Sequence, residues 1–289
     1  EAPFSPAPGV FGPARLVAEW DRLAARVAEL PPPVAELARP GLRKVVDFQD
    51  LSYGAAYLDR LGRVIATDSA AQGWVLSREA AKYVANAMAY DDIIRVADLK
   101  TRGRRFDRIR KEMRVNEANL LQLTEFFHPR AEEIVGLFPA RLGARIEADP
   151  KWMARLDRWF NKGRRLRTDG LRAFLTLHLI GGLRGWRRRT LRHAQEEAHL
   201  GRWLDHALGH VTSNYDLAVE LIRCRRLIKG YSDTHARGQS KFDRVLKATA
   251  TVAGRDDAAD WCRRLREAAL RDEDGKALDG VILTIRSFA

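Results

Sequence analysis

The sequence predicts an all-α protein, folded as one irregular domain of about ten helices. Apolar residues recur at three- and four-residue spacing in nearly every segment, which is the period of one face of an α-helix. Sustained alternation of apolar and polar residues does not occur, so we expect no substantial sheet; residues 63–67 form the only short strand candidate. No motif recurs at a fixed period, which argues against a repeat solenoid.

The chain opens with a segment that is typical of a linker. Residues 1–13, EAPFSPAPGVFGP, contain four prolines. Proline-rich stretches of this kind form extended spacers between domains. We therefore interpret residues 1–13 as an interdomain linker and residues 14–289 as a single helical domain, the C-terminal part of a longer subunit. A trimmed tag junction is the alternative origin of this start.

Helices of the first half follow from apolar stripes and from residues that start or stop a helix. The stripe from Leu16 to Leu30 predicts the first helix, which the prolines at 31–33 end. Ser77 is expected to cap a helix that continues to about Leu99. Further helices are expected at residues 42–61, 102–113 and 129–137.

Helices of the second half are predicted in the same way. Pro150 fits the first turn of a helix that carries Trp152 and Trp159. Gly230 fits the C-terminal cap of a preceding helix, where a positive φ is required. The expected ranges are 150–160, 168–183, 186–208, 215–228, 234–252, 257–271 and 278–288.

The charge of the chain is strongly positive and unevenly distributed. The formal net charge is +13, and residues 141–192 hold fifteen Arg or Lys residues against four acidic ones. Arginine suits the recognition of planar oxyanions and protein contacts better than lysine does. The partners that this charge permits are an acidic protein, a phosphorylated cofactor, nucleic acid or an anionic membrane surface.

The cysteine content excludes two classes of structure. Cys224 and Cys262 are the only cysteines, and both lie in predicted helices. Two cysteines do not make a disulfide framework, nor a zinc or iron–sulfur site built from this chain alone. No signal peptide or bilayer-spanning segment is recognisable. A reducing, cytoplasmic location fits best.

The densest group of polar side chains lies between two predicted helices, at residues 229–238. Lysine, phenol, carboxylate, hydroxyl, imidazole and guanidinium groups occur within these ten positions. Free N–H groups at the start of the following helix attract anions. We predict an anion- or partner-binding loop, with a capped structural corner as the alternative; its candidate residues are Lys229, Tyr231, Asp233, Thr234, His235 and Arg237.

A second candidate surface follows the apolar run 171–183. Arg184, Arg187, Arg188 and Arg189 come directly after this run, and Trp186 lies among them. We interpret the run as a buried helix that leads into a basic subunit contact. A helix lying on an anionic membrane is the alternative.

Other constellations lack the rest of a site. Asp91 and Asp92 have no second acidic pair, so we expect salt bridges rather than a metal site. At helical spacing Asp91 faces Arg95, and Asp98 faces Arg102. The Glu-x-x-His at Glu196 and His199 is half of a di-iron motif whose other half is missing. No nucleophile elbow, P-loop, dinucleotide-binding glycines or zinc-protease motif occurs, so no independent active site is evident. Recognition signatures for nucleic acid are also absent, which makes nucleic acid an unlikely partner.

Several long segments resemble one known family. KGYSDTHARGQSKFDR (229–244) resembles the C-terminal helical region of indolepyruvate ferredoxin oxidoreductase beta subunits. AAKYVANAMAYDDIIRVADLKTRGRRFDRIR (81–110), TEFFHPRAEEI (124–134) and DDAADWCRRLREAALRDEDGKALDG (256–280) fit the same family. The resemblance covers most of the chain after the linker.

The resemblance implies a function for the complete enzyme more than for this region. Such enzymes, of the 2-oxoacid:ferredoxin oxidoreductase family, oxidatively decarboxylate arylpyruvates to an acyl-CoA and reduce ferredoxin. Thiamine diphosphate and iron–sulfur clusters belong mainly to the partner alpha subunit, and the N-terminal gamma-type domain is not seen here. The expectation is an accessory domain for assembly with the catalytic alpha subunit, or for contact with CoA or ferredoxin. The alternative is a basic helical module that binds nucleic acid or another anionic partner.

Overall fold

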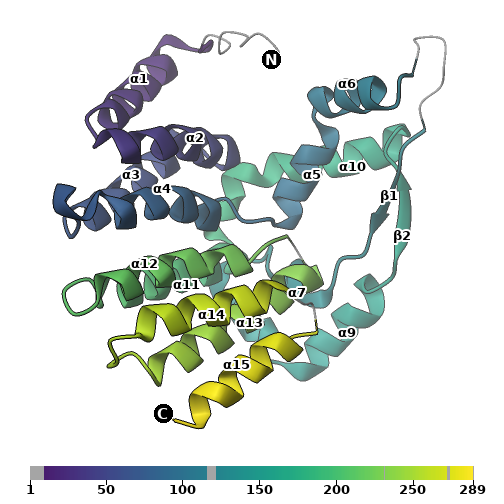
Figure 1. The fold of residues 1–289 in the computed structure, drawn as a ribbon. Coiled ribbons are helices and arrows are strands. Elements are labelled where there is room, and N and C mark those ends of the chain that lie inside the picture. Colours follow the sequence, from purple (N-terminus) through teal and green to yellow (C-terminus); the bar gives the residue numbers. More distant parts are fainter. Residues whose placement is uncertain (1–9, 116–121, 231, 272–273, 289) are drawn as a thin grey trace. The chain divides into compact units, whose positions relative to one another are not determined.

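The fold is all-α, as the sequence predicts. The computed structural model describes residues 10–115, 122–230, 232–271 and 274–288. These ranges contain fifteen α-helices, three 3-10 helices and one antiparallel ladder of two strands (Figure 1). The expected number of about ten helices was too low, partly because aspartate caps divide two of the predicted helices and partly because the helix at Ala140–Glu147 was not expected. Asp50 and Asp92 each accept a hydrogen bond from the backbone N–H three residues later and so begin new helices.

The chain folds into two compact units, residues 1–89 and residues 90–289. In unit 1 the described residues form four α-helices and a short 3-10 helix. They are α1 (Ala14–Ala28), α2 (Pro32–Phe48), α3 (Leu51–Ile65), η1 (Ala70–Gln72) and α4 (Val75–Met88). Two buried tyrosines tie these helices together: Tyr53 and Tyr57 donate hydrogen bonds to the carbonyls of Met88 and Ala81. Residues 63–65 belong to α3, so the strand expected there is not formed.

Unit 2 begins with a helical arm. The arm consists of α5 (Ile93–Thr101), α6 (Gly103–Glu112), β1 (Thr124–Phe127), β2 (Arg164–Arg167) and α10 (Leu171–Gly182). Helices α5 and α10 pack along each other, and α6 follows α5 in the chain. The strands pair in antiparallel register, with Thr124 opposite Arg167. The sequence pattern did not indicate these strands, because four residues are too few to establish alternation.

The remaining elements of unit 2 form its main body. Its first part comprises α7 (Ala131–Val135), α8 (Ala140–Glu147), α9 (Pro150–Phe160) and η2 (Leu183–Arg189). Its second part comprises α11 (Leu191–Leu208), α12 (Tyr215–Arg223), η3 (Cys224–Leu227), α13 (Ser232–Ala250), α14 (Ala258–Arg271) and α15 (Lys276–Arg286). Helix α14 packs against α12, α13 and α15, and α11 packs against α8 and α12 (Figure 1).

Two carboxylates of low exposure join elements of unit 2. Glu220 of α12 is buried and pairs with Arg263 and Arg266 of α14. Glu125 of β1 pairs with Lys100 of α5 and with Arg105 of α6. Inward-facing arginines of this kind form ion pairs within the protein, so less of the positive charge of the chain remains for external partners.

Helix α13 begins close to the backbone of η3, and a glycine makes this approach possible. A Cβ atom on Gly238 would lie 2.6 Å from the carbonyl oxygen of Leu227. Gly230, which precedes the helix, has a φ of +68°, as its predicted capping position requires.

We expect Gly238→Ala to destabilise unit 2 by about 1–3 kcal/mol, because the added methyl group forces α13 away from η3. Thermal unfolding followed by circular dichroism measures the effect. Gly201→Ala in α11 is the matched control, since a Cβ there meets nothing within 4 Å; alanine should raise helix stability there by up to about 1 kcal/mol. Equal melting temperatures for the two variants would contradict the close packing.

Candidate functional site

The predicted loop at 229–238 is mostly the start of a helix. Helix α13 begins at Ser232, so the residues after it lie three to four apart on helix faces. Thr234 and Arg237 share one face, and His235 lies on another. The candidate residues therefore separate into two groups. Tyr231 lies outside the described residues.

The first group surrounds a basic hollow of about 210 Å³. Lys229, Thr234 and Arg237 line it, and Lys241 and Arg271 add two more cations from α13 and α14. Lys241 donates a hydrogen bond to the carbonyl oxygen of Ala269 at 3.3 Å, near the end of α14. No side chain is described for Asp233, although its backbone is helical. Cations from three segments converge on this hollow, which suits an anionic group.

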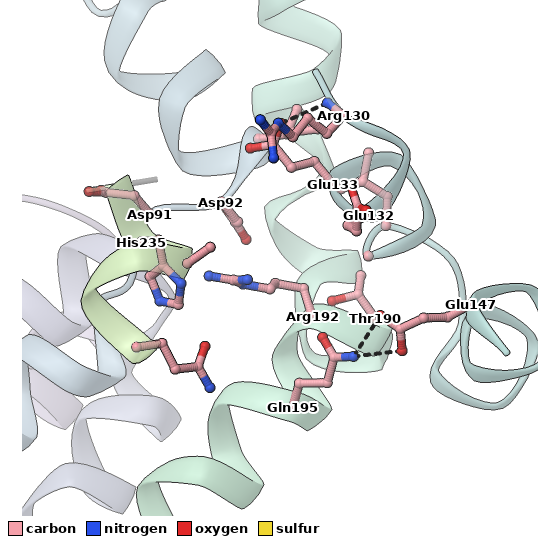
Figure 2. A pocket seen from close by; sticks show the side chains of 15 residues that line it. Asp91, Asp92, Arg130, Glu132, Glu133, Glu147, Thr190, Arg192, Gln195 and His235 are labelled. Carbon is pink, nitrogen blue, oxygen red and sulfur yellow. Dashed lines mark hydrogen bonds between the residues drawn. The ribbon is translucent and has the colours of Figure 1, made fainter. Parts of the chain in front are cut away.

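His235 lines a different hollow, which we name the acidic cavity (Figure 2). Its volume is about 300 Å³, and it lies between α7, α11, α13 and the segment 91–93. Its walls carry both signs of charge. Its carboxylates belong to Asp91, Asp92, Glu132, Glu133 and Glu147; its guanidinium groups belong to Arg130 and Arg192.

A buried charge cluster adjoins this cavity, and we name it the Glu196 cluster. The Glu196 carboxylate lies 2.8 Å from Arg192 Nη2, 3.1 Å from His235 Nε2 and 3.7 Å from Arg225 Nη2. Burial alone would raise the pKa of Glu196, but His235, Arg192 and Arg225 outweigh burial and lower this pKa to about 2. Glu196 is therefore ionised throughout the neutral range. Three elements, α11, η3 and α13, meet at this one carboxylate.

The cluster holds more donors than its carboxylate can satisfy. Arg225 is buried, and its Nε and Nη1 atoms have no hydrogen-bond partner. The buried Nε of Arg192 also has no hydrogen-bond partner. Neither has His235 Nε2, which lies within ion-pair distance of Glu196 but lacks hydrogen-bond geometry. Unsatisfied buried donors are rare in folded proteins, and a bound water, ion or ligand is among the groups that can satisfy them.

Arg192 also faces a second hollow, of about 380 Å³. This hollow shares Arg192, Gln195 and Gln239 with the acidic cavity and continues along α11 to His199 and Arg202. Burial and the charge of Arg225 lower the pKa of His199, so the imidazole is neutral at pH 7. Its ring packs against Phe242 rather than forming a pair with Glu196.

The predicted basic surface is only partly exposed. Arg188 and Arg189 are exposed and Arg184 is half-buried, but Arg187 is 1% exposed and does not belong to that surface. Its Nε atom donates to Asp92 Oδ2 at 2.8 Å, because the buried Asp92 needs a cation. Asp92 thus caps α5 and anchors η2 at the same time.

The helix that precedes these arginines is not the buried helix that we expected. Along α10 and the start of η2, four leucines at four-residue spacing point outward: Leu171 (73% exposed), Leu175 (47%), Leu179 (72%) and Leu183 (43%). Leu177 alone among the leucines of α10 is buried, since α10 packs on α5 through a single face. We name the four leucines, together with Arg184, Arg188 and Arg189, the α10 surface.

Sequence reasoning named Glu196 and His235 separately but missed Arg192 and Arg225 of the Glu196 cluster. The spacing of Arg192 and Glu196, four apart on one helix, was a usable signal. Arg225 gave none, because Glu196 lies far from it in the chain. The predicted salt bridge between Asp98 and Arg102 is formed, but Arg95, which was expected to pair with Asp91, pairs with Asp98. None of the described helices has the length and apolar character needed to cross a membrane.

The fold and these sites define an all-α domain that offers binding surfaces. Residues 34–248 match the model of a family of unknown function, DUF6537, and the chain belongs to that family. No curated protein and no solved structure matches it.

Proposed function

We propose that this chain is an accessory helical domain of an indolepyruvate or related 2-oxoacid:ferredoxin oxidoreductase subunit, and that its main task is to hold the catalytic alpha subunit. The resemblance of four segments to that family supports the assignment. Three of these segments, 81–110, 124–134 and 229–244, lie within the region that matches the family of unknown function.

The α10 surface carries the proposal. Leucines four apart form a ridge of the type that packs into the groove of another helix. Burying one leucine side chain contributes ~1.5–3 kcal/mol, so two or three of them are enough to dominate a subunit contact. Large exposed apolar ridges with a polar rim are typical of protein interfaces.

The rim of the α10 surface indicates the chemistry of the partner. Arg188 and Arg189 are exposed beside Leu183, and Arg189 stacks over Trp186 at 5.6 Å. Arginine and tryptophan are enriched in the energetically important parts of interfaces. We therefore infer that the catalytic subunit presents an apolar groove bordered by carboxylates.

Iron–sulfur clusters do not fit this chain. Its only cysteines, Cys224 and Cys262, are both buried, with their Sγ atoms 3.6 Å apart. A cluster that is held by cysteines alone needs four thiolate ligands. We propose that the clusters and thiamine diphosphate are held by the partner subunit. The basic hollow supports a contact with an anion of the complete enzyme, the phosphates of CoA or the acidic surface of ferredoxin.

The double variant Leu175→Glu/Leu179→Glu should weaken binding to the catalytic subunit by about 100-fold or more, because two leucines that the subunit contact would bury become charged. Isothermal titration calorimetry of the full-length subunit with the purified catalytic subunit measures the Kd.

Leu283→Glu is the matched control. Leu283 is equally exposed but lies on α15, and its replacement should leave the Kd unchanged. Vesicles of anionic lipid test the rival role of the α10 surface as a membrane contact. An unchanged Kd for the double variant would overturn the proposed role, and so would loss of vesicle binding without loss of subunit binding.

A further inference from the structure

We propose that the acidic cavity binds a small zwitterion, a free α-amino acid, with its carboxylate at Arg192 and its ammonium group at the carboxylates that line the same cavity. This site is separate from the α10 surface and from the basic hollow. It does not depend on the proposed subunit contact.

The carboxylate end follows from the missing acceptor at the Glu196 cluster. One carboxylate faces two guanidinium groups and an imidazole there, and Arg192 Nε remains buried without a hydrogen-bond partner. Figure 2 shows the Arg192 guanidinium beside His235, which is itself more than nine-tenths buried and lines the cavity. A planar carboxylate is the acceptor that matches a guanidinium group best.

The ammonium end follows from the carboxylates of the cavity. Asp91, Glu132 and Glu133 line it together with Arg192. The Glu133 carboxylate accepts a hydrogen bond from the backbone N–H of Arg130 at 3.0 Å, which fixes its position. Burial raises the pKa of Glu133, and a cation beside this carboxylate would stabilise its ionised form.

The guanidinium and carboxylate groups of the cavity together exclude simpler ligands. A phosphate dianion would meet the three carboxylates and be repelled by them. An amine without a carboxylate would leave the donors of Arg192 unsatisfied. The apolar side chains of Ile93 and Leu137 complete the lining, and a volume of about 300 Å³ admits an amino acid of medium size.

Isothermal titration calorimetry of the purified chain tests the proposal. The probes are the twenty free amino acids, with inorganic phosphate, the decarboxylated amine and the deaminated acid of the best binder as comparisons. We expect at least one amino acid to bind with a Kd below 1 mM, and both the amine and the acid to bind at least tenfold more weakly.

Two variants locate the site. Arg192→Gln should weaken binding tenfold or more, and Glu132→Gln about fivefold; Glu132 is exposed at the rim, so the latter variant tests the site even where Arg192→Gln does not fold. Glu267→Gln, an exposed position on α14, is the control and should bind as the unmodified chain does. Absence of binding by every amino acid, equal binding of amine or phosphate, or unchanged affinity in Glu132→Gln would overturn the proposal.

Discussion

Replacing Glu196 with glutamine should lower the stability of unit 2 by about 3–5 kcal/mol at pH 7. The change removes the carboxylate of the Glu196 cluster, which leaves the buried Arg225 with an uncompensated charge and takes the ion-pair partner from the half-buried Arg192. Losing one partner of a buried ion pair costs this much because the remaining charge is still kept out of water. Urea denaturation followed by tryptophan fluorescence measures the loss.

The same carboxylate predicts a pH dependence of stability. The pKa of Glu196 is about 2 in the folded protein, below its ordinary value of 4.5. A lowered folded-state pKa means that the stabilisation is complete above the unfolded-state value and is lost as the pH falls toward about 2. The loss amounts to about 3 kcal/mol.

Glu196→Gln should therefore show a flatter stability profile between pH 4.5 and 2 than the unmodified protein. Glu112→Gln is the control for an exposed pair, since Glu112 lies 3.6 Å from Arg108 on the surface of α6. Exposed pairs contribute only about 0–1 kcal/mol. Two profiles of equal slope for Glu196→Gln and the unmodified protein would contradict the role of the cluster.

Asp92→Asn should be the other strongly destabilising substitution, with a loss of about 3–5 kcal/mol. Asparagine still caps a helix, so the start of α5 is kept while Arg187 loses its counter-charge. Arg187 is almost completely buried, which prevents water from replacing the lost carboxylate. Chemical denaturation at pH 7 measures the difference.

Asp50→Asn supplies the matched control in unit 1. Asp50 caps α3 through the backbone N–H of Tyr53, just as Asp92 caps α5, and it also accepts hydrogen bonds from the uncharged side chains of Gln49 and Ser52. We expect a loss below about 1 kcal/mol for this variant. Equal losses in the two variants would show that capping, rather than the buried ion pair, determines the effect at Asp92.

Local signals in the sequence predicted local structure well. The helical period identified the fold class, Pro150 marked the start of α9, and Gly230 marked a backbone position with positive φ. Caps inside an apolar stripe were missed at Asp50 and Asp92, because the stripe continues across the break. The number of helices was underestimated partly for that reason.

Long-range pairing was beyond the reach of the sequence. Arg187 and Asp92 are separated by 95 residues, and periodicity does not report which partner a charged residue meets. The candidate residues at 229–238 were grouped as one loop, but a helix that begins at Ser232 directs Arg237 and His235 into different hollows. Residues that were assigned to one site therefore line two separate hollows.

The position of α10 in the assembled enzyme tests the central claim most directly. A photo-crosslinking amino acid at position 179, in the full-length subunit mixed with its catalytic partner, reports what covers this helix; position 283 on α15 serves as the comparison. The proposed subunit contact through α10 predicts a cross-link from position 179 to the catalytic subunit and none from position 283. An assembled enzyme in which position 179 forms no cross-link to that subunit would contradict it.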